Sequence, residues 1–143
     1  MNLANFLNFE LLRERQSEQF LSIFLSKFLF DRSNEAEDLL RNCLTIKLAP
    51  GDAVWRKADL HSRLGSALIA VVVADPAITS EDRHAKLTEA EALLLQGHAA
   101  LQKAGKVATK YRSDALTRIV RLYEAWQKPE QAAEWREKLK ELK

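Results

Sequence analysis

Residues 88–94 read TEAEALL, and residues 34–40 (NEAEDLL) and 130–135 (EQAAEW) follow the same pattern. In each stretch a small alanine stands third, and larger apolar residues follow about one helical turn later. A small residue lets two helices approach closely, and the larger residues fill the adjoining space. Three copies of one such pattern predict an all-α fold made of repeated helical hairpins.

A second pattern precedes each of these stretches. Phe24 lies twelve residues before Ala36, and Val120 lies twelve residues before Ala132, but Gly65 lies twenty-five residues before Ala90. The middle hairpin is therefore expected to be longer than its neighbours by thirteen residues. The three copies of this second pattern are Phe20-x2-Ile23-Phe24-x2-Lys27, His61-x2-Leu64-Gly65-x2-Leu68 and Leu116-x2-Ile119-Val120-x2-Tyr123.

Together the two patterns resemble the tetratricopeptide repeat, W-x2-L-G-x2-Y followed by A-x3-F. The chain is most similar to the repeats at the C-terminal ends of large bacterial serine/threonine kinases and related signalling proteins. The segments that support this are LGSAL (64–68), EAEALLLQG (89–97), LYEAW (122–126) and PEQAAEWR (129–136), and the similarity covers about 31–142. The sequence departs from the pattern at His61, in the aromatic position, and at Phe24 and Val120, in the glycine position. The resemblance implies antiparallel hairpins stacked as a right-handed solenoid.

We expect one domain, residues 1–143, with about seven helices. Apolar periodicity, caps and Pro/Gly breaks define the helices. The hairpins are expected at about 17–48, 53–104 and 109–142, after a first helix at 2–13. A strand competes with helix at Ile69–Val73, where β-branched residues cluster. We favour helix up to Asp75-Pro76, because the apolar periodicity upstream is unbroken. Further expected boundaries are a Thr79/Asp82 cap, a stop at Gly105, a helix over 109–127 and a last helix that begins at Pro129.

Composition is that of an ordinary globular protein, with 47% hydrophobic and 29% charged residues. The net charge is +2. Residues 103–143 carry eleven Lys/Arg against six Asp/Glu, a net of +5. The single cysteine, Cys43, excludes an internal disulfide and is expected to be a packed core thiol. No signal peptide or stretch long enough to span a membrane is recognised, so a cytoplasmic protein is expected.

The first helix of each hairpin lines the concave groove that the resemblance implies. Arginines in such a groove suit an acidic peptide or protein partner. Ser62 and Ser66 are expected on the solvent side of their helix. The predicted groove residues are Asp59, Ser62, Arg63, Ser66, Asp114, Thr117, Arg118, Arg121 and Glu124.

A catalytic constellation is not recognised, so an enzyme is not predicted. His61, His84 and His98 lack metal-ligand spacing, and neither a metal nor another cofactor is expected. His98 could approach Glu91 or Glu37 in space, but no feature of the sequence requires it. Trp126 and Trp135 are expected to pack on each other across the last turn.

The N-terminal hairpin is unusually apolar. Leu21, Leu25 and Phe28 fall at groove positions that are polar in the later copies. An exposed apolar strip favours self-association, and a symmetric dimer is the simplest closed arrangement. Sedimentation of the wild type beside a Leu25→Glu, Phe28→Glu variant would test this; a wild type that stays monomeric at high micromolar concentration would refute it.

These features favour a non-catalytic protein–protein interaction module. The alternative is a nucleic-acid-associated regulator that uses the basic C-terminal hairpin, and it is the less favoured of the two.

Overall fold

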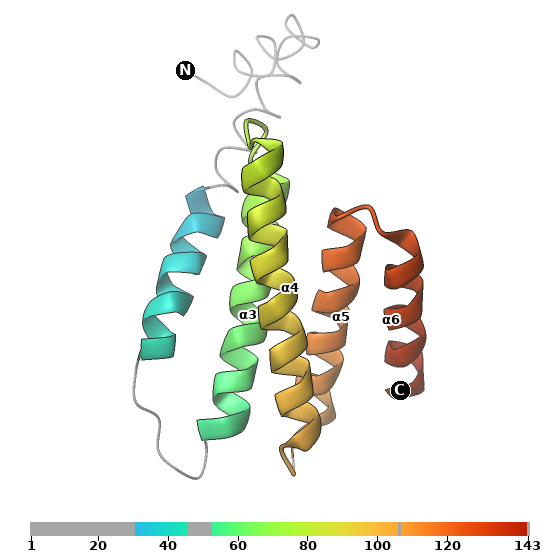
Figure 1. The fold of residues 1–143 in the computed structure, drawn as a ribbon. Helices are drawn as coiled ribbons and strands as arrows, with labels where there is room; N and C mark the ends of the chain where they lie inside the picture. Colours follow the sequence, from blue (N-terminus) through green and yellow to red (C-terminus); the bar gives the residue numbers. More distant parts are fainter. Residues whose placement is uncertain (1–30, 46–52, 106, 143) are drawn as a thin grey trace, which may run out of the picture.

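The computed structural model describes residues 31–45, 53–105 and 107–142. These residues form five helices packed antiparallel. The helices are 31–45, α3 (Ala53–Ala74), α4 (Ser80–Lys103), α5 (Thr109–Ala125) and α6 (Pro129–Leu142). The 31–45 helix lies on one side of the α3–α4 pair, and α5 and then α6 lie on the other (Figure 1). The helices predicted at 2–13 and 17–30, with Leu21, Leu25 and Phe28, fall outside the described residues.

The apolar run at Ile69–Val73 is helical, and the described ranges contain no strand. Helical periodicity explains why. Ile69 and Val72 are buried in the core, whereas Val73 is 68% exposed. Leu87 of α4 is fully buried in the same core cluster and helps to cover the run. The prediction of helix over strand is therefore confirmed for this segment.

Local signals define most helix ends. The Thr79 side chain accepts a hydrogen bond from the backbone N–H of Asp82 at 3.1 Å, so Thr79 caps α4 as expected. Proline begins α6, also as expected. The helix predicted over 109–127 ends earlier, since Trp126 is the C-cap of α5. α4 ends at Lys103 with Ala104 as its C-cap, whose N–H bonds to Ala100, so Gly105 follows the cap; it does not adopt the left-handed conformation of a glycine cap.

An arginine completes the end of α4. The Arg112 guanidinium donates to the backbone carbonyls of Leu101, Ala104 and Gly105 at 3.3, 3.3 and 3.1 Å. These carbonyls lie in the last turn and the loop, where helical acceptors lack intrahelical partners. The Arg112 side chain of α5 therefore supplies hydrogen bonds to carbonyls that a glycine cap would otherwise help to satisfy.

The middle hairpin is the longest part described, as the spacing predicts. α3 and α4 have 22 and 24 residues, whereas α5 and α6 have 17 and 14. Its two helices also approach closely at two glycines. A Cβ at Gly65 would lie 2.7 Å from the Leu94 side chain, and one at Gly97 would lie 2.7 Å from the Ala58 carbonyl oxygen. Gly65 of α3 therefore faces α4.

The core extends from this pair onto α5. Its main cluster joins α3 and α4 to Ile119, Leu122 and Tyr123 of α5, and Ala132 of α6 closes it. A smaller cluster lies at the other end, where Ala58, Leu101 and Ala115 meet. α5 thus packs against both helices of the preceding hairpin, and α6 contributes a single buried residue.

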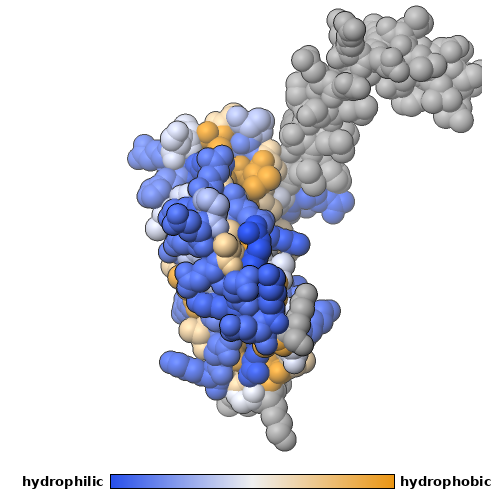
Figure 2. All heavy atoms as spheres, turned by 90° about the vertical axis from the view of Figure 1, so that its right-hand side faces the viewer, coloured by the Kyte–Doolittle hydropathy of each residue, from blue (hydrophilic) through white to orange (hydrophobic). Residues whose placement is uncertain are grey.

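The face that carries α6 is mostly hydrophilic, with small apolar areas toward its two ends (Figure 2). α6 therefore covers the edge of the stack without offering a broad apolar surface. No helix within the described residues is both long and apolar enough to cross a membrane.

Candidate functional site

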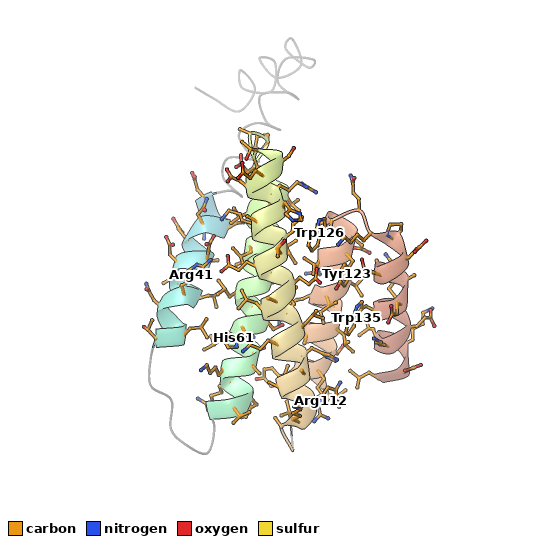
Figure 3. All side chains as sticks on the ribbon, in the orientation of Figure 1. Arg41, His61, Arg112, Tyr123, Trp126 and Trp135 are labelled. Atoms are coloured by element: carbon orange, nitrogen blue, oxygen red, sulfur yellow. The ribbon has the colours of Figure 1, made fainter. Side chains whose placement is uncertain are left out.

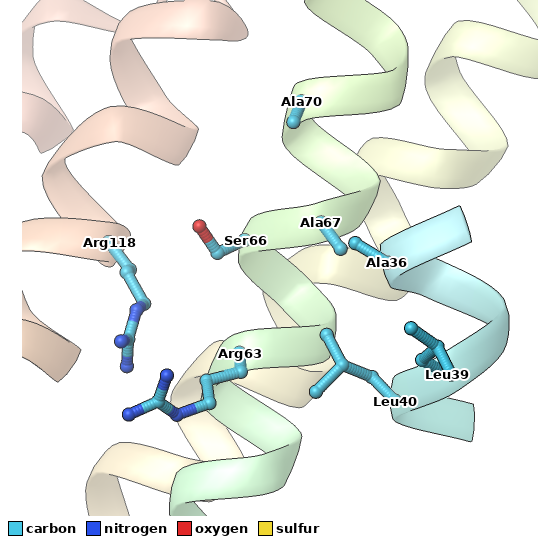
Figure 4. A pocket seen from close by; sticks show the side chains of 8 residues that line it. All are labelled: Ala36, Leu39, Leu40, Arg63, Ser66, Ala67, Ala70 and Arg118. Atoms are coloured by element: carbon cyan, nitrogen blue, oxygen red, sulfur yellow. The ribbon is translucent and has the colours of Figure 1, made fainter. Parts of the chain in front are cut away.

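A pocket of about 470 Å³ opens along α3, between the 31–45 helix and α5. Figure 4 shows two different sides to it. Ala36, Leu39 and Leu40 lie on the 31–45 helix at one side, and Arg118 reaches in from α5 at the other. The part of α3 between them contributes Arg63, Ser66, Ala67 and Ala70. The pocket is thus apolar at one end and cationic at the other.

A single carboxylate organises the cationic end. Asp59 Oδ2 accepts a hydrogen bond from Arg63 Nε at 2.7 Å, and its Oδ1 lies 3.6 Å from Arg118 Nη1. Arg118 Nη1 also donates to Ser62 Oγ at 3.0 Å. The hydrogen bond to Asp59 raises the pKa of Arg63. Burial lowers the pKa of Arg118, and the charge of Asp59 opposes that effect.

The two arginines differ in what they can offer a ligand. The Arg63 side chain is 48% exposed, whereas that of Arg118 is 14% exposed. Arg63 uses Nε for Asp59, and its guanidinium extends to the side of α3 on which Arg118 lies (Figure 4). Arginine favours bidentate contacts with planar anions. Arg63 is therefore the more accessible of the two guanidinium groups, and Arg118 lies against the same carboxylate from the buried side.

The structure brings together only part of the predicted groove. Arg63, Ser66 and Arg118 line the pocket, and Asp114 lies near enough to both arginines to affect their pKa. The expected solvent exposure of Ser62 is wrong, because Ser62 is fully buried under the Arg118 guanidinium. Asp59 is 8% exposed and acts inside the cluster.

The remaining groove candidates lie on α5. Thr117 is half-buried and donates to the Ser113 carbonyl of its own helix. Arg121 and Glu124 are exposed, and neither lines the pocket along α3. Glu124 instead pairs with Arg136 of α6. This ion pair between α5 and α6, which the sequence does not reveal, accounts for the orientation of Glu124 away from the pocket.

A second pocket, of about 400 Å³, adjoins the first and shares Arg63 with it. Trp55 of α3 and Tyr111 of α5 form one wall, with ring centroids 5.0 Å apart and planes tilted by 53°. Arg56, Asp59 and Leu60 complete the lining. Neither Tyr111 nor Leu39 and Leu40 is among the predicted site residues. Leu39 and Leu40 belong to the repeated stretch and look like core, yet Leu39 is 65% exposed.

Ion pairs fasten the 31–45 helix to α4. Arg41 Nη2 lies 2.9 Å from Glu89 Oε1 and 3.0 Å from Glu37 Oε1. Lys86 of α4 lies 3.7 Å from the other oxygen of Glu37. None of residues 31–45 is fully buried, and Cys43, expected as a core thiol, is only half-buried. Polar contacts thus account for much of the attachment of the helix that forms the apolar wall.

The aromatic side chains near the last turn have partners other than those predicted. Figure 3 places Trp126 and Trp135 at different heights along the α5–α6 hairpin. The Trp126 ring meets His84 at 5.8 Å, and the Trp135 ring meets His98 edge-on at 5.3 Å. The expected mutual packing of the tryptophans is therefore replaced by two contacts to α4. His98 also lies near Lys138, with which it lines a small pocket.

The free energy of unfolding is expected to fall as the pH is lowered from about 7.5 to 5.5. Burial, with a smaller effect of Lys138, lowers the pKa of His98, and burial with Lys57 lowers that of His61. The unfolded state then binds protons first, near the ordinary histidine pKa of about 6.5, so acid favours unfolding. Urea titrations at both pH values measure this. His98→Gln should reduce the pH dependence, and an unchanged dependence would contradict the assignment.

No protein-family model, curated protein or solved structure matches the chain.

Proposed function

We propose that this chain is a cytoplasmic, non-catalytic protein-interaction module of tetratricopeptide-like hairpins that binds a peptide segment of a partner along α3. The observation on which the proposal rests is the pocket between the 31–45 helix, α3 and α5. It combines an apolar wall with a half-exposed arginine, the combination that peptide grooves use for anchoring and for orientation. A solenoid of about seven helices, with further hairpin surface before residue 31, belongs to the same proposal.

The order in which the helices pack on one another supports the proposal of stacked helical hairpins. α5 contacts both α3 and α4, and α6 contacts α5 and closes the row with a polar outer face. Repeat proteins place each new hairpin on the preceding one in this way and end in a polar capping helix. The first helices of the two described hairpins, α3 and α5, supply both arginines of the site.

The nucleic-acid alternative has weaker support. Several basic residues of the C-terminal hairpin are paired with carboxylates of the same hairpin, which leaves less charge for a phosphate backbone than the count of residues suggests. These pairs are Arg136 with Glu124, Lys138 with Glu134 and Lys140 with Glu137.

Selection of random dodecapeptides on the full chain tests the proposal. We expect selected peptides to lose at least tenfold in affinity for Arg63→Glu, because the reversal places a carboxylate where the ligand anion binds. Arg136→Glu is the matched control: its side chain is 47% exposed, close to the 48% of Arg63, and it also pairs with one carboxylate. Peptides that lose as much affinity for the control, or a failure to select any, would refute the proposal.

A further inference from the structure

Two pockets flank Arg63 along one face of α3. The residues of α3 that line them follow helical spacing, so they form a continuous stripe: Trp55, Arg56, Asp59, Leu60, Arg63, Ser66, Ala67 and Ala70. The pocket toward Ala70 is walled by leucine and alanine. The pocket toward Trp55 is walled by an aromatic pair. The stripe therefore presents an aliphatic site, a cation and an aromatic site in that order.

The spacing of these sites fits an extended chain. The α3 residues that line the two pockets are centred about eight residues apart, which is roughly 12 Å along the helix axis at a rise of 1.5 Å per residue. An extended peptide covers that distance in about four residues, and its side chains at i, i+2 and i+4 share one face. Arg63 lies between the pockets, opposite the central of these three positions.

The charge of the stripe selects the central side chain. Three arginines and one aspartate line the two pockets, a net of +2, and nearby Asp114 reduces it to +1. Asp59 is already engaged by Arg63 and Arg118. An incoming carboxylate is therefore favoured over a neutral or basic side chain.

We propose that the partner segment is an extended acidic peptide with an aliphatic residue, an Asp or Glu and an aromatic residue at i, i+2 and i+4, in either chain direction. This inference rests on the proposed function and names its ligand. The aliphatic side chain enters the pocket beside Leu39 and Leu40, the carboxylate pairs with Arg63, and the ring packs beside Trp55 and Tyr111. Internal sequence suffices, because no contact requires a chain terminus.

Synthetic peptides with acetylated and amidated ends test the motif on the full chain. The probe is Ser-Gly-Leu-Ser-Glu-Ser-Tyr-Gly-Ser, made also with Leu and Tyr exchanged, and binding is followed by fluorescence polarisation of a labelled copy. In whichever of the two peptides binds more tightly, we expect replacement of the glutamate by glutamine to weaken binding about tenfold. Moving the glutamate by one residue should have a similar effect, because it turns the carboxylate to the other face.

Variants of the protein assign the effect to Arg63. On Arg63→Gln the glutamate and glutamine peptides should differ less than twofold, whereas on Arg136→Gln the tenfold difference should remain. A difference that persists on Arg63→Gln overturns the inference. If neither probe binds but selected peptides of another composition do so in an Arg63-dependent manner, the motif is wrong and the interaction function stands. If no peptide of any kind binds, both fall.

Discussion

Gly97→Ala is expected to destabilise the protein by about 2 kcal/mol, although alanine is the better helix former by about 1 kcal/mol. The reason is the approach of α3 and α4. A Cβ at Gly97 would lie 2.7 Å from the Ala58 carbonyl oxygen, 3.2 Å from the Ser62 backbone nitrogen and 3.3 Å from Ser62 Cβ. Two of these atoms are backbone, so they yield only if the helices separate. Thermal unfolding followed by circular dichroism should show a fall of about 6–10 °C.

Two other glycines provide the controls. Gly65→Ala should cost less, about 1 kcal/mol, because the two closest atoms, at 2.7 and 3.0 Å, belong to the Leu94 side chain and the one backbone atom, the Ala90 carbonyl oxygen, is farther away at 3.1 Å. Gly105 has nothing within 4 Å of an added Cβ, so Gly105→Ala should leave the melting temperature unchanged or slightly higher. A Gly97→Ala protein as stable as the wild type would show that the helices are farther apart than described.

Arg118→Met should lower the free energy of unfolding by about 2–3 kcal/mol, because it leaves a nearly buried carboxylate without one of its two cations. Asp59 Oδ1 has no hydrogen bond and lies 3.6 Å from Arg118 Nη1. The fully buried Ser62 hydroxyl would lose its donor in the same substitution. Chemical denaturation at pH 7 measures the loss.

The matched control is Arg63→Met, which removes the other cation from the same carboxylate. Because the Arg63 side chain is 48% exposed, solvent screens its pairing, and we expect a loss of at most about 1 kcal/mol. Adding Asp59→Asn to Arg118→Met should recover part of the loss, since the uncompensated charge is removed. Equal losses from the two arginine variants would contradict the division into a positioning arginine and a ligand-binding arginine.

This division matters for the proposed interaction. Ser62 accepts a hydrogen bond from Arg118, Arg118 lies 3.6 Å from Asp59, and Asp59 accepts a hydrogen bond from Nε of Arg63, so this chain of contacts orients the Arg63 guanidinium. A preorganised side chain loses less conformational entropy when a ligand binds. Under the proposed function, the cost of the buried charges is linked to recognition, and this would explain why polar residues occupy positions that a purely structural hairpin would fill with apolar ones.

The positions and most of the ends of the helices in the described hairpins follow from the sequence alone. The bounds of α3 at Ala53 and Ala74, the cap at Thr79 and the start at Pro129 agree with prediction. These features depend on residues within a turn or two of one another, so local periodicity, capping and proline geometry suffice. The longer middle hairpin also follows, because it is set by the number of residues between repeated positions.

The site itself was decided by tertiary structure. Arg63 and Ser66 were predicted from their helical positions, but only the placement of α5 buries Ser62 beneath Arg118 and turns Asp59 inward. Only the placement of the 31–45 helix makes Leu39 and Leu40 a pocket wall. His98 likewise meets Trp135 because α6 lies across it. A sequence fixes which residues share a face of one helix, whereas the rotation and distance of a second helix come from packing summed over many side chains.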